Sequence, residues 1–373
     1  MRAEDFTEIL QADFYTGVPD SQLKALCDYL MERYGTDSRH HLIAANEGNC
    51  TAIAAGYHMA TGKYPVVYMQ NSGEGNAVNP IASLLHEKVY NIPVIFVIGW
   101  RGEPGVHDEP QHIFQGEVTL PLLKDLQIPY FVVEKETDKE AVSTAMEDFK
   151  RELFKNHSVA FVIKKGALSC ETPVKYSNGH SLNREAVIET IAEYTGSDPV
   201  ISTTGKISRE LFEIRERHSQ DHKYDFLTVG SMGHSSSIAL GIALQKPETR
   251  VWCIDGDGAM LMHMGSLAVI GSVKPENLIH IVLNNGAHET VGGMPTAAEK
   301  LDVTGVAESC GYEYVASVSD MESLKRELSS AMENRRLTLI EVKCAIGSRK
   351  DLGRPTTAAQ DNKRNFMEYL NTI

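Results

Sequence analysis

Two clusters of polar residues, separated by 25 residues, could together bind a metal ion. The tripeptide Gly256-Asp257-Gly258 follows the apolar run 251–254, and Asn284-Asn285 follows the apolar run 279–283. We expect both clusters at the carboxyl ends of parallel strands, where open α/β sheets bind ligands. A carboxylate, a carboxamide and a nearby backbone carbonyl are hard oxygen ligands that suit Mg²⁺, with ligand phosphates completing the shell. The alternative is two ordinary turns, because Asp-Gly and Asn-Gly are common turn dipeptides.

Strand-like and helical patterns alternate along the chain. This alternation predicts α/β domains with mostly parallel sheets, whose strands would position the two clusters. In the first half the strand-like runs are 14–18, 42–45, 66–69, 94–98, 131–133 and 160–163. In the second half they are 200–202, 226–229, 251–254, 279–283, 314–315 and 337–342. Helical patterns lie between them, for instance at 47–60 and 139–154. We therefore expect two doubly wound parallel-sheet domains.

A more polar segment interrupts this alternation near residues 167–183. Because the two series of strands are of similar length, the simplest organisation is two domains joined by this segment. We expect a first domain over residues 1–167, a linker over residues 168–183 and a second domain over residues 184–373.

Composition excludes several classes of protein. The 373 residues include 36 basic and 50 acidic side chains, a net charge of −14, so no electrostatic footprint for nucleic acid is evident. Six cysteines are scattered without a CxxC pair, which favours reduced thiols, and Cys253 is expected in the core. The N-terminus lacks a hydrophobic signal core, and no apolar run approaches membrane-spanning length. We expect a cytoplasmic protein that does not bind membranes.

Two further features stand beside the metal motif. Glu47 follows an apolar run and begins a helix rich in small residues, where a buried carboxyl group could act as an acid or base. The alternative is a glutamate favoured at a helix start by the macrodipole. The segment Gly230-Ser231-Met232-Gly233 follows an apolar run in the second half, although methionine is also a common gap filler in cores.

These three features, in this order over most of the chain, resemble the thiamine diphosphate enzymes. The resemblance implies that Asp257, Asn285 and the backbone carbonyl of Ala287 hold Mg²⁺ against the diphosphate. It implies that Glu47, as a buried acid, shares a proton with the aminopyrimidine ring of the cofactor. In that family the carbonyl at Gly230 would meet the exocyclic amine, and Met232 would support the bent shape of the cofactor. The first domain would then bind the pyrimidine and the second the diphosphate.

The diphosphate needs donors besides the metal. The segment Ser202-Thr203-Thr204-Gly205 is expected to open a helix whose N-terminal amides meet the diphosphate. The alternative is a simple cap before the helix that begins near Lys206. The resemblance completes the cofactor site with residues next to these motifs: Ser202, Thr204, Gly205, Ser231, Gly258 and Ala259.

Several longer segments are more specific, and the chain has no room for the third domain that many members of the superfamily contain. The segments TGVPDS, NSGEGNAVNP, LNNGAHET and GSRKDLGRPT make nearly the whole chain similar to the 3-phosphonopyruvate decarboxylases and their sulfopyruvate relatives. The resemblance implies conversion of 3-phosphonopyruvate, a small 2-oxo acid, to phosphonoacetaldehyde and CO₂. It also implies a homodimer or larger homo-oligomer with active sites at the chain interface.

The substrate bears two anionic groups and therefore needs cations. Arg101 in the first domain and three residues near the C-terminus, Arg349, Lys350 and Arg354, are the candidates. Asp20, His107 and His112 occupy positions like the substrate-side acid and histidines of the family. The chain departs from the simple 2-oxo acid decarboxylases, which place a glutamate where Val291 stands here. His288 or Glu289 could substitute, and spacing does not choose between them.

Other functions on the same framework stay open. One is a sulfopyruvate decarboxylase or another 2-oxo acid decarboxylase, and another is an aldehyde-forming ligase. A non-catalytic regulatory or binding subunit is the remote alternative. The retention of Glu47, Asp257 and Asn285 argues against an inert subunit.

Overall fold

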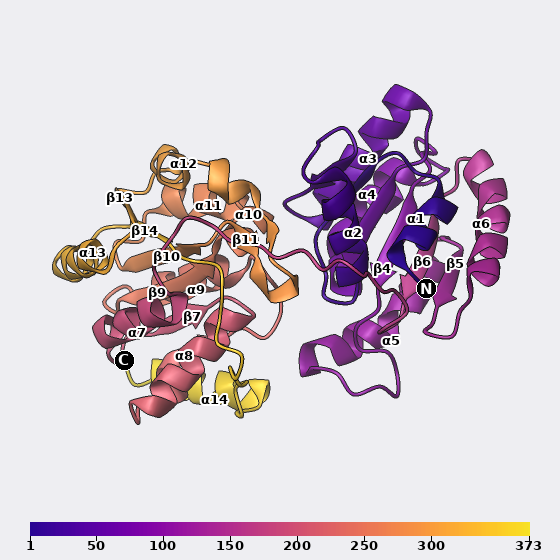
Figure 1. The fold of residues 1–373 in the computed structure, drawn as a ribbon. Coiled ribbons are helices and arrows are strands. Elements are labelled where there is room, and N and C mark those ends of the chain that lie inside the picture. The colour runs from indigo at the N-terminus through magenta and orange to yellow at the C-terminus, as the bar shows by residue number, and fades with distance from the viewer. The chain divides into compact units, whose positions relative to one another are not determined.

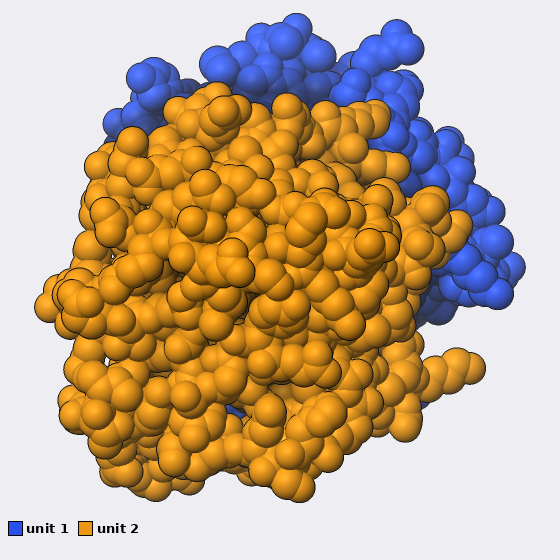
Figure 2. Space-filling view, turned by 90° about the vertical axis from the view of Figure 1, so that its left-hand side faces the viewer, with its two compact units in different colours: residues 1–175, 291–294 blue, residues 176–290, 295–373 orange.

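The computed structural model describes all residues from Met1 to Ile373, and the chain forms two compact units (Figures 1 and 2). The first contains residues 1–175 and 291–294, and the second contains residues 176–290 and 295–373. The division between Lys175 and Tyr176 falls inside the segment 168–183 that the sequence predicts to be a linker. Isolated bridges attach one end of this segment to Arg2 through Ser169 and the other to Cys344 through Leu182.

The first unit is built on a parallel six-stranded sheet with the order β2-β1-β3-β4-β6-β5. Its strands are β1 (Tyr15–Gly17), β2 (His41–Ile43), β3 (Val66–Gln70), β4 (Ile95–Gly99), β5 (Tyr130–Val133) and β6 (Val159–Ile163). Its helices are α1 (Ala3–Leu10), α2 (Lys24–Tyr34), α3 (Glu47–Thr61), α4 (Glu74–Pro80), α5 (Pro110–Asp125) and α6 (Lys139–Phe154). All residues of β4 and β6 are buried, as expected for central strands covered on both faces.

The second unit repeats this architecture with the order β13-β14-β10-β9-β7-β8, again parallel. The strands are β7 (Val200–Ser202), β8 (Asp225–Leu227), β9 (Val251–Gly256), β10 (Leu278–Asn284), β13 (Tyr314–Val318) and β14 (Thr338–Lys343). The loop after β10 contains the short strands β11 (Ala287–His288) and β12 (Met294–Pro295). The helices are α7 (Arg184–Thr195), α8 (Lys206–Arg217), α9 (Ser235–Gln245), α10 (Asp257–Met262), α11 (Gly265–Val273), α12 (Val303–Cys310), α13 (Met321–Glu333) and α14 (Ala359–Leu370).

Helices cover both faces of the second sheet, because alternate residues along each strand point to opposite sides. Along β9, Trp252 and Ile254 pack with apolar residues of α7, α8 and α13. Val251 and Cys253 pack on the other face with residues of α9, α11, α12 and α14. This confirms the predicted doubly wound α/β class and the placement of Cys253 in the core.

The predicted strands all occur, and their bounds differ from the prediction by at most three residues. The largest difference is at β13, which continues to Val318 because it pairs with β14 along its whole length. Polar caps explain where several helices begin: Asn46, Asp138 and Asn183 each accept a hydrogen bond from a backbone N–H of the first turn. None of the helices combines the length and the apolar character that crossing a bilayer would need.

Candidate active site

In the second unit, the two polar clusters lie side by side. Strands β9 and β10 are parallel neighbours, with Leu283 opposite Gly256, so Asp257 and Asn285 follow strand ends at the same edge of the sheet. Asp257 is the first residue of α10 and is 3% exposed, and Asn285 is 5% exposed. The structure therefore brings together the two side chains that the sequence proposes as metal ligands.

Asp257 is a buried carboxylate without a basic partner. Burial raises its pKa to about 6, although a 2.5 Å hydrogen bond from Thr296 and backbone N–H groups act in the opposite direction. The largest influences on this pKa are burial, Thr296 and backbone N–H groups, and none of them is a lysine or an arginine. Because a buried carboxylate ordinarily needs a cation, this site fits a bound divalent metal ion. Asp257, the amide oxygen of Asn285 and the carbonyl of Ala287 are the ligands it would use.

The two consecutive asparagines have different surroundings. Asn284 donates to Glu341 at 2.7 Å and accepts from the N–H of Gly286 at 3.0 Å, which shapes the turn in which Gly286 has a φ of 68°. Asn285 donates to Glu289 at 2.8 Å and accepts from the N–H of Ala287 at 3.1 Å. Asn284 is thereby part of the turn, and Asn285 is the carboxamide beside Asp257.

Four charged residues form a cluster behind Asn285 that the sequence does not predict. Arg184 donates to Glu210 at 2.7 and 2.8 Å and to Glu289 at 2.5 Å, and Lys206 donates to Glu289 at 2.9 Å. Burial alone would raise the pKa of Glu289, but the two cations outweigh it and lower this pKa. Glu289 is therefore ionised. No spacing signal could have found the cluster, because its members come from α7, α8 and the loop after β10.

The predicted diphosphate segment lies between β7 and α8. Ser202 is buried and its hydroxyl contacts that of Ser208 at 2.7 Å, while the Thr204 hydroxyl donates to the carbonyl of Val229 at 2.8 Å. Gly205 precedes the first residue of α8 with a φ of 94°, a conformation that favours glycine. Thus the segment does open a helix, as predicted.

The segment around Met232 converges on the same edge of the second sheet. A Cβ placed on Gly258 would lie 3.3 Å from the end of the Met232 side chain and 3.3 Å from the ring of His288. Ser231 has a φ of 53°, the left-handed conformation. Burial lowers the pKa of His288 to about 4, so its imidazole is neutral at pH 7. The structure therefore groups Met232, Gly258 and His288, which the sequence analysis proposed separately.

In the first unit, polar residues follow four neighbouring strands. The sheet order β2-β1-β3-β4 places the segments after these strands along one edge. The residues at these strand ends are Glu47 after β2, Asp20 after β1, Gln70 and Asn71 at β3, and Arg101 after β4. This edge is the counterpart of the Asp257 edge in the second unit.

Glu47 is a buried acid with few polar neighbours. It is 4% exposed and accepts a hydrogen bond from the amide of Asn76 at 2.7 Å. A Cβ on Gly73 would lie 2.3 Å from its Oε1, so a larger residue at this position would displace the carboxyl group. Burial raises the pKa of Glu47, and the hydrogen bond from Asn76 offsets this in part. The group is suited to holding or sharing a proton.

Asp20 and Arg101 lie at the same edge. Asp20 is fully buried and accepts from Gln70 at 2.5 Å and from the N–H of Gln22 at 3.0 Å. Burial raises its pKa, against the lowering effects of Gln70 and Arg101. Arg101 binds Asp108 through two nitrogens, at 2.5 and 2.8 Å, and donates to Ser21 at 3.1 Å.

The two candidate histidines differ in their surroundings. His112 is half-buried and its Nδ1 lacks a hydrogen-bond partner. Burial, together with the charge of Arg101, lowers the pKa of His112 to about 4. His107 lies in an exposed stretch of the loop between β4 and α5. His112 is thus the histidine that the structure places near Arg101.

Sequence reasoning missed Asn71, which ties these residues together. Its amide nitrogen donates to the carbonyl of Arg101 at 2.8 Å, and its oxygen accepts from the N–H of Arg101 at 3.1 Å. It also donates to Thr119 of α5 at 2.9 Å. Asn71 begins the turn that contains Gly73, so one side chain connects the Arg101 loop with the backbone beside Glu47. The motif NSGEGN was the available signal.

The basic residues near the C-terminus lie between β14 and α14. Arg349 pairs with Glu185 of α7 at 3.0 Å and with Glu213 of α8, so its partners are helix carboxylates rather than residues at the strand ends. Lys350 and Arg354 are exposed.

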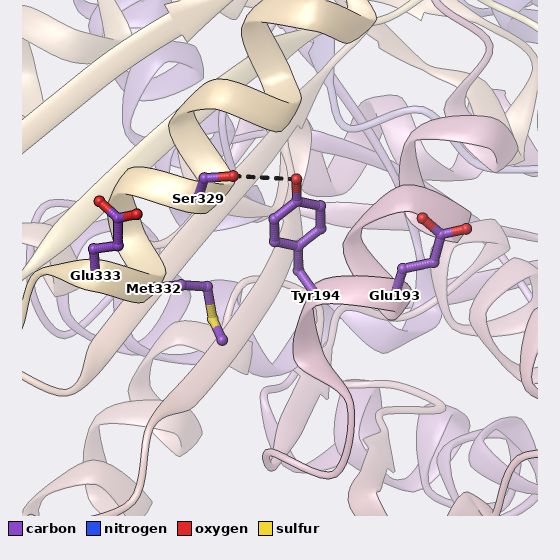
Figure 3. A pocket seen from close by; sticks show the side chains of 5 residues that line it. All are labelled: Glu193, Tyr194, Ser329, Met332 and Glu333. Atoms are coloured by element: carbon purple, nitrogen blue, oxygen red, sulfur yellow. Dashed lines mark hydrogen bonds between the residues drawn. The ribbon is translucent and has the colours of Figure 1, made fainter.

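Two other features of the second unit do not belong to these edges. A depression of about 450 Å³ between α7 and α13 is lined by Glu193, Tyr194, Ser329, Met332 and Glu333 (Figure 3). The buried side chains of Cys253, Asp255 and His280 lie together behind the metal motif. Burial raises the pKa of the Cys253 thiol far above its usual range, so this thiol stays protonated and is a core residue.

Comparisons with known proteins match both units. Residues 3–123 match the thiamine pyrophosphate enzyme N-terminal TPP binding domain, and residues 203–342 match the C-terminal TPP binding domain. The chain is 33% identical over 374 residues to a phosphonopyruvate decarboxylase of Streptomyces viridochromogenes, covering 95% of this chain and 91% of the relative. It is 33% identical over 372 residues to the same enzyme of Streptomyces hygroscopicus, covering 95% and 89%. A sulfopyruvate decarboxylase of Methanosarcina acetivorans is 27% identical over 383 residues, covering 96% and 94%.

The two matched domains, with a buried acid at each sheet edge, define a thiamine pyrophosphate enzyme of the decarboxylase class. Within that class the chain belongs to the phosphonopyruvate decarboxylase family, to which the sulfopyruvate decarboxylases are related.

Proposed function

We propose that this enzyme decarboxylates 3-phosphonopyruvate to phosphonoacetaldehyde with thiamine diphosphate and Mg²⁺. The observation that favours this substrate is the 33% identity over 95% of the chain to two phosphonopyruvate decarboxylases, against 27% to the full-length sulfopyruvate decarboxylase. The reaction would belong to phosphonate biosynthesis in the cytoplasm, in keeping with six cysteines that form no disulfide.

The residues of the second unit would bind the diphosphate half of the cofactor. Asp257, Asn285 and the Ala287 carbonyl would hold Mg²⁺, and Gly230 and Met232 would contact the cofactor itself. The diphosphate contacts would come from the neighbouring loops and helix starts: Ser202, Thr204, Gly205, Ser231, Gly258 and Ala259. When bound, thiamine diphosphate supplies the electron sink that loss of the carboxylate requires.

The residues of the first unit would act on the pyrimidine ring and on the substrate. Glu47 would share a proton with the pyrimidine ring, because burial favours its protonated form. Asp20, with a pKa also raised by burial, would serve as the substrate-side acid, together with His112 or His107. Arg101 would bind an anionic group of the substrate. Arg349, Lys350, Arg354 and His288 are the further candidates for substrate binding.

We also propose that the enzyme is a homodimer or larger homo-oligomer with each cofactor bound between two chains. The resemblance to the family supports this arrangement, in which Glu47 of one chain and Asp257 of its neighbour complete one site. A single chain would then lack a complete active site, and cofactor binding would stabilise the dimer by mass action.

A product assay tests the substrate. The purified protein is incubated with thiamine diphosphate, Mg²⁺ and, separately, phosphonopyruvate, sulfopyruvate or pyruvate, and the aldehyde and CO₂ are measured. We expect the highest kcat/KM for phosphonopyruvate. A preference for sulfopyruvate would instead assign the function of the Methanosarcina relative, and no turnover of any acid by cofactor-loaded protein would favour a non-catalytic subunit.

A further inference from the structure

The loop after β10 contains a carboxylate that determines how Asn285 is oriented. The Oε2 atom of Glu289 accepts a hydrogen bond from Nδ2 of Asn285 at 2.8 Å. Because a carboxylate paired with an arginine and a lysine accepts hydrogen bonds, the amide nitrogen of Asn285 faces Glu289. The amide oxygen of Asn285 therefore faces the other way, where it accepts from the N–H of Ala287 at 3.1 Å and keeps a second lone pair for another partner.

Glu289 is itself fixed by two cations from different helices. Arg184, at the start of α7, reaches Oε2 at 2.5 Å, and Lys206, at the start of α8, reaches Oε1 at 2.9 Å. The side chain of Glu289 is only 8% exposed. Donors occupy both carboxylate oxygens of Glu289. Glu289 therefore does not act as the substrate-side acid in place of the glutamate that the simple 2-oxo acid decarboxylases have at the position of Val291.

We propose that Glu289 is a positioning residue that holds the Asn285 amide with its oxygen toward Mg²⁺, and that Arg184 and Lys206 hold Glu289. The inference rests on the proposed cofactor site. Glu289 does not touch the ion; it acts through Asn285. Residues in this outer position orient metal ligands and affect metal affinity almost as strongly as the ligands do.

The charges of the cluster allow the effect of the Asn285 amide orientation to be separated from the effect of the net charge near the metal site. Arg184 and Lys206 balance Glu210 and Glu289, so the cluster is neutral as a whole. Glu210 binds Arg184 at 2.7 and 2.8 Å, and its hydrogen bonds go to Arg184 rather than to Asn285. Removal of either carboxylate changes the net charge equally, but only removal of Glu289 frees the amide of Asn285.

The experiment compares Glu289→Met with Glu289→Gln. Methionine offers no acceptor to Asn285, whereas the carbonyl oxygen of glutamine can take the place of Oε2 and accept from both Asn285 and Arg184. The amide nitrogen of glutamine would then replace Oε1, so Lys206, whose side chain is 25% exposed, loses this acceptor and turns to solvent. Titration calorimetry measures Mg²⁺ binding in the presence of saturating thiamine diphosphate. We expect Glu289→Met to weaken Mg²⁺ binding by about 10- to 100-fold. Glu289→Gln should retain nearly the wild-type affinity, as should the charge-matched control Glu210→Gln.

Each outcome has a separate meaning. Wild-type Mg²⁺ affinity in Glu289→Met would overturn the inference, and an equal loss in Glu289→Gln would show that charge rather than orientation matters. If Glu289→Met does not fold, Lys206→Met/Glu289→Met keeps the cluster neutral, since Arg184 and Glu210 remain paired, and the same loss is expected. If the wild-type protein itself binds no Mg²⁺ with thiamine diphosphate, the proposed cofactor site fails instead.

Discussion

Glu47 and Asp257 are buried acids in equivalent places of the two units, yet their neighbours suit them to different tasks. Each is the first residue of a helix that follows a strand end, and burial raises the pKa of both. Glu47 lies against the backbone at Gly73 and accepts one side-chain hydrogen bond, from Asn76. Asp257 lies instead beside the turn that contains Asn285 and its amide oxygen.

The difference shows that burial alone does not decide what a carboxyl group does. An isolated acid in an apolar site keeps or shares a proton, because its charged form is poorly solvated. An acid next to a carboxamide oxygen and a backbone carbonyl completes a set of hard ligands, so a divalent cation can replace the proton. The same fold thus suits the acid of the first unit to sharing a proton and the acid of the second unit to the metal-binding role that we propose.

Among the changes that test this comparison, substitution of Asp257 is expected to have the largest effect. Asp257→Ala is expected to abolish binding of thiamine diphosphate, because the diphosphate would lose its bridging cation. Calorimetric titration with cofactor and Mg²⁺ measures this. Asp361, whose side chain is 46% exposed in the first turn of α14, provides the control, and Asp361→Ala should bind normally. Wild-type affinity in Asp257→Ala would remove the metal assignment.

Glu47→Gln tests the proton site. Glutamine keeps the size of the side chain and can form a hydrogen bond, but it cannot share a proton with the ring. We expect cofactor binding to be retained and exchange of the C2 proton of the bound cofactor to slow by at least about a hundredfold. Deuterium exchange followed by NMR after acid quench measures the rate. An unchanged rate would show that Glu47 has no part in activation.

Mixing the two variants tests whether the two acids of one site come from different chains. In a mixed dimer of Glu47→Gln and Asp257→Ala, one of the two sites would receive both intact residues. Random exchange of subunits should then restore about a quarter of the wild-type activity. Phosphonoacetaldehyde formation is measured after exchange. No recovery in verified mixed dimers would mean that both acids of a site belong to one chain.

The two units also differ in their candidate substrate cations. Both arginines are paired with carboxylates, Arg101 with Asp108 and Arg349 with Glu185 and Glu213, but only Arg101 lies at the same sheet edge as Asp20. We expect Arg101→Met to raise the KM for phosphonopyruvate by about 10- to 100-fold, which is the loss of one or two charge-assisted hydrogen bonds. Arg349→Met should change KM little. Steady-state kinetics of both variants decides between them, and the reverse order would place the substrate anion at Arg349.

The fold was predictable because buried parallel strands are apolar along their whole length, and helices begin at visible caps. The polar residues at strand ends were predictable for the same reason: once β9 and β10 are recognised, Asp257 and Asn285 must follow them. Their partners were not. Thr296 donates to Asp257, Arg184 donates to Glu289 beside Asn285, and Asn71 bonds to the backbone of Arg101, each from a position far away in the sequence. Nothing in local spacing indicates such contacts.

Glu74 is a further buried acid in the first unit, and it lies within the polar motif NSGEGN, where no pattern indicated its burial. It is 3% exposed, and neither of its carboxylate oxygens has a hydrogen-bond partner. Burial raises its pKa to about 8, although Thr119 and Gln115 act in the opposite direction. Glu74 therefore resembles Glu47 in burial but has no polar contact comparable with that from Asn76.

Glu74→Gln tests how the burial of this carboxyl group changes the free energy of unfolding with pH. In the folded protein the acid keeps its proton up to about pH 8, whereas in the unfolded chain it loses the proton near the ordinary glutamate pKa of 4.5. The folded state thus binds more protons between these values, so the contribution of Glu74 to the free energy of unfolding falls as pH rises from 4.5 to 8. The slope for one proton is at most about 1.4 kcal/mol per pH unit.

Glutamine does not titrate, so Glu74→Gln should become more stable relative to the wild type as pH increases through this range. Urea unfolding at pH 5, 6.5 and 8 measures the trend. The pKa of Glu47 is raised in the same direction, so part of the pH dependence remains in Glu74→Gln. Equal pH dependence in the variant and the wild type would mean that Glu74 is ionised or hydrated in the folded protein. Glu74→Gln should leave the exchange rate of the C2 proton of the bound cofactor unchanged. It is therefore the matched control for Glu47→Gln.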